Sequence, residues 1–325
     1  MRFFRPGSFA MTSKRIFVIY TGGTLGMQPT PRGYQPLAGW LEQQLRQLPE
    51  LQQAEMPDFV LHEYAPLLDS SDMQPADWQT IAADIHAHYD DYDGFVVLHG
   101  TDTMAYSAAA VQCLLPGLGK PVIFTGSQIP LAEAGSDAPA NIRNALYAAA
   151  HSGITQVGIV FHRQLLPAEY ATKVDAQGLA AFAAPNAKPL LEWKDQYLNL
   201  QELLPVKNGN KPELKTVTEK KIAVLTLHPG MDFELTAQWL AHPWDAVILQ
   251  TFGSGNAPQH PTLLTALTAA SARGVRIVNR SQCARGTVQN TYSGAYALAE
   301  CGVVAGGDQT LEMLLARLMT DSFWV

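Results

Sequence analysis

The sequence RIFVIYTGGTLG, residues 15–26, carries the pattern from which the fold can be predicted. Its first half, Arg15–Tyr20, is rich in β-branched and aromatic residues, as is typical of a strand buried on both faces. Gly22 and Gly23 follow, and adjacent glycines allow a sharp turn that presents Thr24 and nearby backbone N–H groups. A capping threonine at a tight strand–helix turn explains the same spacing equally well. In both cases the stretch predicts the first strand and turn of a parallel β/α sheet.

Similar apolar runs recur along the chain and are separated by segments long enough for helices. The predicted strands are Arg15–Tyr20, Phe59–His62, Gly94–Leu98, Pro121–Phe124, Val157–Phe161, Lys221–Leu227, Ala246–Leu249 and Gly274–Val278. The predicted helices are Trp40–Leu48, Pro75–His88, Asn141–Ala150, Leu263–Arg273 and Gln309–Met319. This alternation predicts an α/β protein with a larger N-terminal parallel-sheet domain and a smaller C-terminal α/β domain.

The length of the chain also indicates two domains, because 325 residues exceed the roughly 100–200 that are usual for one. We expect residues 1–13 to be a disordered extension, residues 14–190 the catalytic α/β domain and residues 220–325 the C-terminal α/β domain. Residues 191–219 are the predicted linker, because the strand–helix pattern stops there and Asn208-Gly209-Asn210 occurs among prolines.

Composition excludes several classes of protein. Hydrophobic residues make up 47% and charged residues 16%, which is too apolar for a disordered chain, and no apolar run is long enough for a spanning helix. A formal net charge of −7 disfavours a nucleic-acid or acidic-membrane partner. Cys113, Cys283 and Cys301 lie far apart, so neither a disulfide framework nor a zinc ribbon is indicated. Because the N-terminus has no signal-peptide core, we expect a cytoplasmic protein.

Hydroxyl-bearing and other polar residues follow the ends of several predicted strands. They occur in the segments Thr21–Gly26, Asp69–Asp72, His99–Met104, Thr125–Pro130 and Ala171–Asp175. The carboxyl ends of parallel strands share one edge, where the ligands of such sheets bind. Each segment alone could be a helix cap or a turn, but together they offer many hydroxyl groups and few aromatic or basic side chains. This edge suits a small polar substrate better than a nucleotide.

Several familiar site patterns are not met. The glycine turn TGGTLG lacks both the G-x-G-x-x-G spacing and the Lys-Ser/Thr pair of a P-loop. His86 and His88 lie two residues apart on a predicted helix and face different sides, which disfavours a metal pair. His99 has no serine in a G-x-S-x-G context, which disfavours an α/β-hydrolase triad.

Five segments taken together resemble the bacterial-type L-asparaginase family. They are YTGGTLG (20–26), DSSDM (69–73), LHGTDTM (98–104), TGSQIP (125–130) and GSGNAPQ (253–259). The resemblance extends from about Lys14 to Leu318, and TGGT and HGTDT in this order are specific motifs. The DSSDM segment and residues 88–106 resemble the cytoplasmic type I branch of this family. The lack of a signal peptide agrees with that branch.

The resemblance implies hydrolysis of L-asparagine to L-aspartate and ammonia, with no metal and no cofactor. It implies Thr24 as the nucleophile that attacks the side-chain amide and forms a β-acyl-enzyme. It implies a second group, made of Thr101, Asp102 and Lys173, that activates water or relays protons. A threonine hydroxyl needs such a neighbouring base, and the oxyanion needs preorganised donors, which backbone N–H groups in the glycine turns could supply.

The same motif positions imply how the substrate is held. Ser71 and Asp102 would bind its α-carboxylate and α-amino groups, with Asp69, Ser70 and Thr101 around them. Tyr34, in a segment with glycine and proline, would lie on a mobile lid over the substrate. Glutamine is one methylene longer than asparagine, so we expect weaker but measurable glutaminase activity.

Members of the type I branch can also carry a second, regulatory asparagine pocket. Thr172, Asn256 and Cys283 match positions expected around it, whereas Gln250 stands where a basic residue would be expected. The resemblance further implies a homodimer or homotetramer with active sites near the subunit interface.

Two alternatives stay open at this point. One is the glutaminase/asparaginase-like subunit of a tRNA-dependent amidotransferase, which the negative net charge and the short segment before TGGT disfavour. The other is a non-catalytic α/β sensor of a small amino acid. The presence of the full set Thr24, Thr101, Asp102 and Lys173 disfavours this second alternative.

Overall fold

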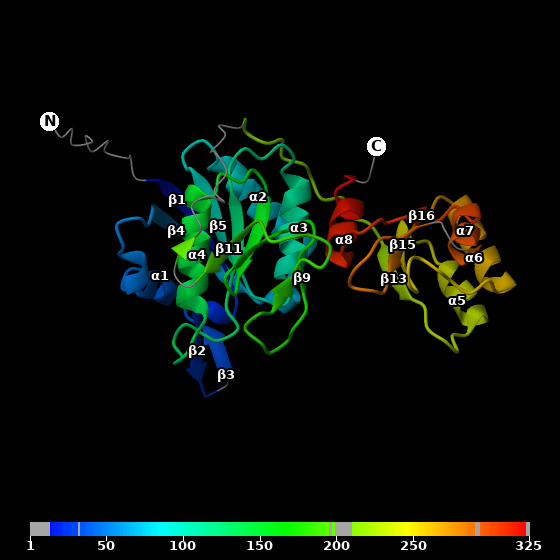
Figure 1. Ribbon diagram of the computed structural model, residues 1–325, viewed down its shortest axis with the longest axis horizontal. Helices are drawn as coiled ribbons and strands as arrows, with labels where there is room; N and C mark the ends of the chain where they lie inside the picture. The colour runs from blue at the N-terminus through cyan, green and yellow to red at the C-terminus, as the bar shows by residue number, and fades with distance from the viewer. Residues whose placement is uncertain (1–13, 32, 195–196, 199–209, 290–292, 323–325) are drawn as a thin grey trace, which may run out of the picture.

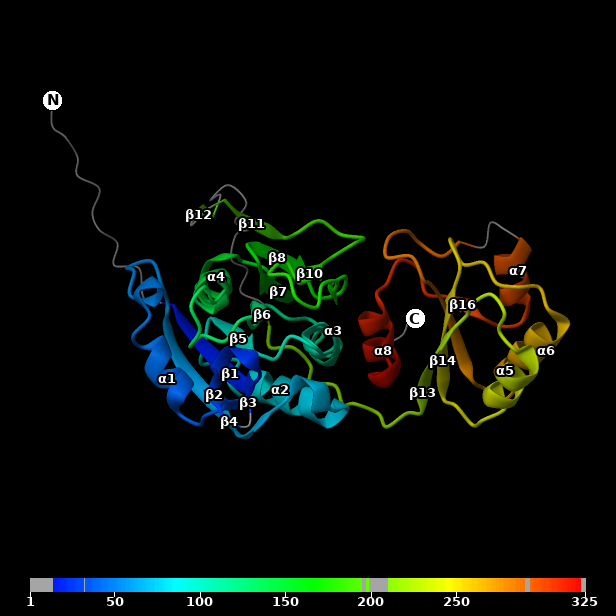
Figure 2. The same cartoon turned by 90° about the horizontal axis from the view of Figure 1, so that it is seen from below.

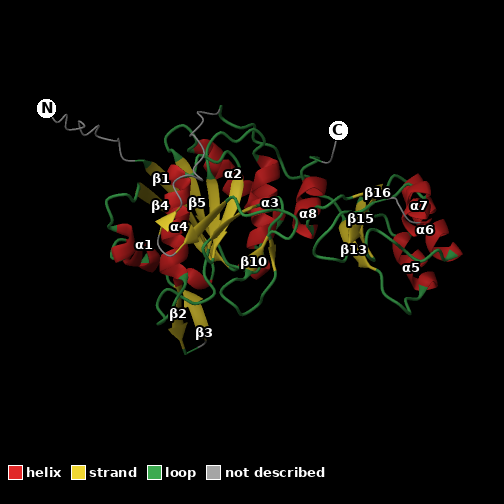
Figure 3. Ribbon diagram, in the orientation of Figure 1, coloured by secondary structure: helices red, strands yellow, loops and turns green. Residues whose placement is uncertain are grey.

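The computed structural model describes residues 14–31, 33–194, 197–198, 210–289 and 293–322 (Figure 1). It contains a large sheet in the N-terminal part and a smaller sheet in the C-terminal part, each with helices on its faces (Figure 3). This confirms the predicted α/β fold with two parallel-sheet domains. Within the described ranges, no helix combines the length and the apolar character needed to cross a membrane.

Among the described residues, the large sheet has eight strands. Their spatial order is β12 (Tyr197–Leu198), β11 (Leu191–Lys194), β8 (Gln164–Pro167), β7 (Val157–Phe161), β6 (Val122–Thr125), β5 (Gly94–Leu98), β1 (Arg15–Gly22) and β4 (Asp58–Leu68). Neighbouring strands from β4 to β7 are parallel, whereas β8, β11 and β12 add antiparallel pairs. The carboxyl ends of β4, β1, β5, β6 and β7 therefore lie along one edge, as the sequence predicted.

Helices and short elements surround this sheet. The helices are α1 (Trp40–Leu45), α2 (Pro75–Ala87), α3 (Met104–Leu114) and α4 (Ala138–His151). The short elements are the 3₁₀ turns η1 (Thr24–Gly26), η2 (Pro49–Leu51) and η3 (Ser70–Asp72), and the strand pairs β2 (Met27–Thr30) with β3 (Gly33–Pro36) and β9 (Thr172–Lys173) with β10 (Phe182–Ala183).

The C-terminal part repeats the arrangement on a smaller scale. Its sheet consists of the parallel strands β13 (Ile222–Thr226), β14 (Ala246–Thr251), β15 (Arg276–Ser281) and β16 (Val304–Ala305). The helices of this part are α5 (Phe233–Leu240), α6 (Pro261–Ala272), α7 (Ser293–Glu300) and α8 (Leu311–Met319).

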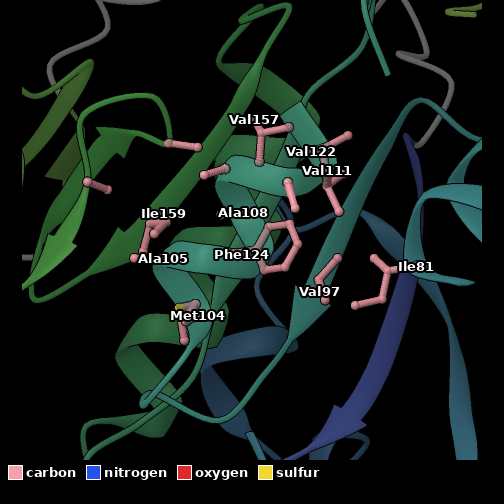
Figure 4. Close-up of a cluster of buried hydrophobic side chains, with 14 of the residues drawn as sticks. Ile81, Val97, Met104, Ala105, Ala108, Val111, Val122, Phe124, Val157 and Ile159 are labelled. Atoms are coloured by element: carbon pink, nitrogen blue, oxygen red, sulfur yellow. The ribbon is translucent and has the colours of Figure 1, made fainter. Parts of the chain in front are cut away.

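The central strands β1, β5, β6 and β7 of the large sheet are buried on both faces, which explains their continuous apolar sequences. Phe95 and Val97 of β5 belong to the core cluster that also contains residues of α2 and α3, whereas Val96 and Leu98 belong to the cluster with α1 and α4. Successive side chains of a strand point to opposite faces, so each strand contributes to both cores. Figure 4 shows Phe124 on the α3 side, in the cluster that also contains Ala105, Ala108 and Val111.

Most predicted elements are confirmed, with instructive differences. The five predicted N-terminal strands match β1, β4, β5, β6 and β7. Helix α1 ends at Leu45 rather than Leu48, before the Pro49 turn of η2. Helix α3 was not among the predicted helices, because its residues are buried almost all round and show no polar stripe from which helical periodicity could be recognised.

The predicted linker, residues 191–219, begins with a strand of the large sheet. β11 pairs with β8, so residues 191–194 belong to the N-terminal sheet. Farther along, Leu214 and Val217 pack against its core, and the Lys215 N–H donates to the Leu114 carbonyl oxygen at the end of α3. Residues 199–209 of the predicted linker, and the predicted extension 1–13, lie outside the described residues.

Helix α8 joins the two parts of the chain. It follows β16 in sequence, but it packs against α3 of the N-terminal part, and Figures 1 and 2 both place it between the two sheets. At this contact the Cys113 thiol lies 3.6 Å from the Met313 sulfur. The last helix therefore supports both domains.

Candidate active site

The turn after β1 brings the backbone next to Thr24 against two neighbouring loops. Gly22 and Gly23 have φ angles of +132° and +97°, which L side chains rarely adopt. A Cβ atom on Gly22 would overlap the Leu68 carbonyl oxygen at the end of β4, and one on Gly23 would overlap the backbone of Gly100 beyond β5. Thr24, half-buried, then opens η1. The glycine pair thus allows the loops after three strands to meet beside Thr24.

The buried side chain of His99 packs under the loop that follows β5 and contacts its backbone. This ring is completely buried, and burial lowers its pKa to about 4, so it is neutral at pH 7. Its Nδ1 lies 2.7 Å from the Gly100 carbonyl oxygen, and its ring is 6.0 Å from that of Phe124. His99 is therefore a core residue that packs beneath the turn.

Lys173 connects three of the predicted site residues. Its Nζ lies 3.0 Å from Thr101 Oγ1 and 2.8 Å from Asp102 Oδ1. Thr101 is 6% exposed, and the Lys173 side chain is 20% exposed, whereas that of Asp102 is 63% exposed. An amine, a hydroxyl and a carboxylate in this contact can pass a proton between them. The structure thus brings together Thr101, Asp102 and Lys173 from β9 and the loop after β5.

Gln128 is a site residue that the sequence analysis missed. The Thr101 hydroxyl donates to Gln128 Oε1 at 3.2 Å, and Gln128 Nε2 donates to the Gly178 carbonyl oxygen at the same distance. The Gln128 N–H is in turn held by the Asp137 carboxylate at 3.1 Å. The sequence places the segment TGSQIP at a strand end, and an amide side chain at that edge was the signal that could have found Gln128.

The loop after β4 contains the residues predicted to bind the substrate. The Asp69 carboxylate caps η3 and accepts hydrogen bonds from the Ser71 N–H at 2.9 Å and the Ser71 hydroxyl at 3.0 Å. Ser70 is buried against Gly100, and its carbonyl oxygen accepts a 2.6 Å hydrogen bond from the Thr103 hydroxyl. This loop is therefore fixed to the loop that carries Thr101, while Asp69 and Ser71 stay exposed.

Tyr34 takes part in a separate hydrogen bond. It is on the β2–β3 hairpin, 49% exposed, and its hydroxyl donates to Glu133 Oε1 at 2.8 Å. This hydrogen bond raises the pKa of Tyr34. In the part of the chain that the structure describes, no hydrogen bond joins the Tyr34 side chain to Thr24, Thr101 or Lys173. Strand β3, which carries Tyr34, nevertheless contacts η1, the turn that begins at Thr24, so the lid role of Tyr34 stays a prediction.

Two of the predicted regulatory residues share a cavity. Thr172 and Cys283 line a hollow of about 230 Å³ whose other lining residues include Arg280, Gln309 and Lys173 itself. Asn256 is not one of the lining residues; it pairs through its backbone with Phe252 in the loop after β14. The Gln250 amide oxygen accepts a hydrogen bond from Thr226.

Within the described ranges, no three His, Cys, Asp or Glu side chains gather where they could hold a metal ion.

The close approach of Gly23 to Gly100 predicts a measurable cost for any side chain at residue 23. Gly23→Ala should lower the free energy of unfolding by the left-handed strain, about 1–3 kcal/mol, and by roughly 1–3 kcal/mol more for overpacking against Gly100. Gly117→Ala is the matched control, since Gly117 has a φ of +80° and a Cβ atom added there would have nothing within 4 Å. Urea unfolding measures both, and equal losses would show that the two loops do not touch.

Comparison with known proteins agrees with this arrangement. A family described as "Asparaginase, N-terminal" matches residues 15–204, and one described as "Glutaminase/Asparaginase C-terminal domain" matches residues 221–320. L-asparaginase 1 of Escherichia coli (strain K12) is 48% identical over 310 residues, which cover 95% of this chain and 91% of that protein. The crystal structure of L-asparaginase I from Vibrio cholerae O1 biovar eltor str. N16961 has a TM-score of 0.88 at 47% identity and covers 96% of this chain and 93% of that one.

A more distant relative bears on one of the alternatives. A glutamyl-tRNA(Gln) amidotransferase subunit of Thermococcus kodakarensis is 31% identical over 260 residues, which cover 77% of this chain but 58% of that protein. The similarity to the two L-asparaginases is higher and extends over nearly the full length of each. The chain therefore belongs to the L-asparaginase family of amidohydrolases, in its type I branch.

Proposed function

We propose that this enzyme hydrolyses L-asparagine to L-aspartate and ammonia at the edge of the large sheet where the loops after β1, β4 and β5 meet. The observation that carries the proposal is the contact of Lys173 with Thr101 and Asp102, on a loop whose Gly100 packs against Gly23 beside Thr24. Two hydroxyl groups from remote parts of the chain then face one small substrate. Family membership supports the same reaction.

In the first step the Thr24 hydroxyl attacks the carbon of the side-chain carboxamide. Its proton passes to the departing nitrogen, the C–N bond breaks, and ammonia leaves behind a β-acyl ester on Thr24. The negative charge on the carboxamide oxygen needs preorganised donors, which backbone N–H groups of the glycine-flanked turns supply. The substrate's α-amino and α-carboxylate groups are bound by Asp102 and Ser71, with Asp69 and Ser70 behind them.

In the second step water hydrolyses the acyl ester. In the resting site the Lys173 Nζ donates to Thr101 Oγ1, and the Thr101 hydroxyl donates to Gln128. During hydrolysis a neutral Lys173 takes the Thr101 proton as Thr101 takes one from water, and Lys173 then returns that proton to the Thr24 oxygen. Asp102 holds the Lys173 side chain in place at 2.8 Å. The water oxygen forms the new C–O bond, Thr24 recovers its proton, and aspartate is released. Tyr34 acts from the lid, whose β2–β3 hairpin is anchored by Glu133 in this conformation.

Separate removal of the two hydroxyl groups tests this assignment. Thr24→Ala and Thr101→Val should each lower kcat for asparagine by roughly 10⁴-fold, because loss of an essential nucleophile or its partner leaves only catalysis by binding. Ammonia release measures the rate. Thr268→Ala, an exposed threonine on α6, is the control and should keep full activity. Turnover close to that of the unmodified protein in Thr24→Ala would refute the nucleophile.

Selectivity between the two amides provides a second test. Glutamine places its carboxamide one methylene farther from the α-groups, and one methylene is usually worth about 1–3 kcal/mol, or 10–200-fold. We predict that kcat/KM for asparagine exceeds that for glutamine by at least about tenfold, and that glutamine is still hydrolysed. Equal values for the two amides would contradict a site that fixes the α-groups at set distances from Thr24.

The cavity beside Lys173 supports a regulatory role as a second proposal. Arg280 and Gln309 line it, and each has one buried polar atom, Nε of Arg280 and Oε1 of Gln309, without a hydrogen-bond partner among the described residues. A donor and an acceptor of this kind suit the carboxylate and amino groups of an amino acid. We propose that asparagine binds here and, through Thr172, alters the neighbouring Lys173.

Saturation curves test this regulatory proposal. The unmodified protein should show a sigmoidal dependence of rate on asparagine concentration, and Cys283→Phe, which fills the cavity, should make the curve hyperbolic. A hyperbolic curve with no lag in the unmodified protein would reject regulation at this cavity, whatever the variant does.

The remaining expectations follow from the same assignment. We propose a homodimer or homotetramer that acts in the cytoplasm, on the basis of the family resemblance. Release of ammonia from free asparagine without tRNA separates this function from that of an amidotransferase subunit. Absence of any turnover would instead favour the non-catalytic sensor.

A further inference from the structure

A buried carboxylate on helix α8 contacts the residue next to Lys173. The Thr172 hydroxyl donates to Glu312 Oε1 at 2.6 Å, and Glu312 is 6% exposed. Burial raises the pKa of Glu312, while hydrogen bonds from Thr172 and Thr310 and the nearby Arg280 charge oppose that rise. A buried carboxyl group keeps its position only where such partners satisfy it. The Glu312 carboxylate is therefore held in one position, and β9 is hydrogen-bonded to it through Thr172.

A second contact fixes the same segment a few residues earlier. Glu169 Oε1 accepts hydrogen bonds from Arg317 at 2.6 Å and from Gln309 Nε2 at 3.3 Å. Arg317 lies on α8 and Gln309 lies just before it. The segment 169–172 is thus held at both ends by α8 and its leading turn.

The strand that carries Lys173 has little support of its own. β9 consists of Thr172 and Lys173 alone, and within the described residues its one strand partner is the equally short β10. Such a short strand pair is marginally stable by itself. The hydrogen bonds from this segment to Glu312 and Arg317 of α8 therefore stabilise the position of β9.

Helix α8 also contacts helix α3, which begins directly after the loop that carries Thr101. Met313 and Cys113 meet in the packing of α8 on α3, and α3 begins at Met104, directly after the loop with Thr101 and Asp102. The Lys173 strand and the Thr101 loop are therefore both attached to one common helix. A shift of α8 relative to β9 would change the Lys173–Thr101 distance.

We propose that Glu312 is a positioning residue that, through its hydrogen bond with Thr172, sets the distance between Lys173 Nζ and Thr101 Oγ1. The inference rests on the proposed role of Lys173 in proton transfer. Glu312 does not touch the reacting atoms. Because it acts through Lys173, the proposed proton-transfer group, its removal should change kcat and not KM. A misplacement of about 1 Å in a catalytic group can cost as much as 10²-fold in rate.

The test uses paired substitutions of Glu312 in the full chain. Glu312→Leu keeps the approximate volume but removes the acceptor, and should lower kcat for asparagine by about 10- to 100-fold with KM changed by less than about threefold. Glu312→Gln keeps an oxygen that accepts from Thr172 and should restore kcat to within about threefold. Unchanged kcat in Glu312→Leu, or an equal loss in Glu312→Gln, would overturn the proposal.

A double-mutant cycle with Lys173→Met separates positioning from general damage. If Glu312 acts through Lys173, Glu312→Leu should change the residual kcat of Lys173→Met by less than about twofold. The same 10- to 100-fold loss in both backgrounds would show a structural effect and refute the proposal. Met313→Ala, which weakens the α8–α3 packing without removing the Glu312 carboxylate, is the stability control and should lower kcat less than Glu312→Leu does.

One further readout does not depend on turnover. In crystal structures of the Glu312→Leu variant, Lys173 Nζ should lie beyond hydrogen-bond distance, about 3.5 Å, from Thr101 Oγ1. An unmodified protein that releases no ammonia would defeat the proposed function alone. A Lys173 that keeps its 3.0 Å contact in the Glu312→Leu crystal would defeat the positioning role alone.

Discussion

The contact of Gly23 with the backbone of Gly100 is the constraint that holds the site together. It occurs at the carboxyl ends of β1 and β5, adjacent strands of a parallel sheet, where two loops leave the sheet side by side. A side chain at Gly23 would force these loops apart, and a side chain at Gly100 would overlap the Ser70 side chain of the loop after β4. The backbone segments that carry Thr24 and Thr101, each one residue beyond a glycine of this contact, are thereby held close together although they are remote in the sequence.

A second constraint comes from the opposite end of the sequence. Lys173 reaches Thr101 from β9, a strand of two residues that the large sheet does not include. Helix α8 holds this strand through Glu312 and Glu169, and it rests on α3, which starts beside Thr101. The C-terminal part therefore contributes to the geometry of a site made of N-terminal residues.

Most of the fold could be predicted because buried parallel strands have continuous apolar sequences, and β1, β5 and β7 stand out for that reason. Helix α3 was missed because a helix buried on all sides has no amphipathic period. The site residues Thr101, Asp102 and Lys173 were found through motif resemblance. Gln128 and Glu312 were not found, because their importance comes from hydrogen bonds to Thr101 and Thr172 that span 27 and 140 residues of sequence. No local pattern records contacts of that separation.

A crystal structure of the enzyme with L-aspartate bound tests the convergence of the two threonines without any inference from kinetics. We predict that the side-chain carboxylate carbon lies between the hydroxyl oxygens of Thr24 and Thr101, each about 3–3.5 Å away and on opposite faces. We also predict the α-carboxylate beside Ser71 and the α-amino group beside Asp102. An aspartate found in a different cavity, or in contact with only one of the two threonines, would contradict this arrangement.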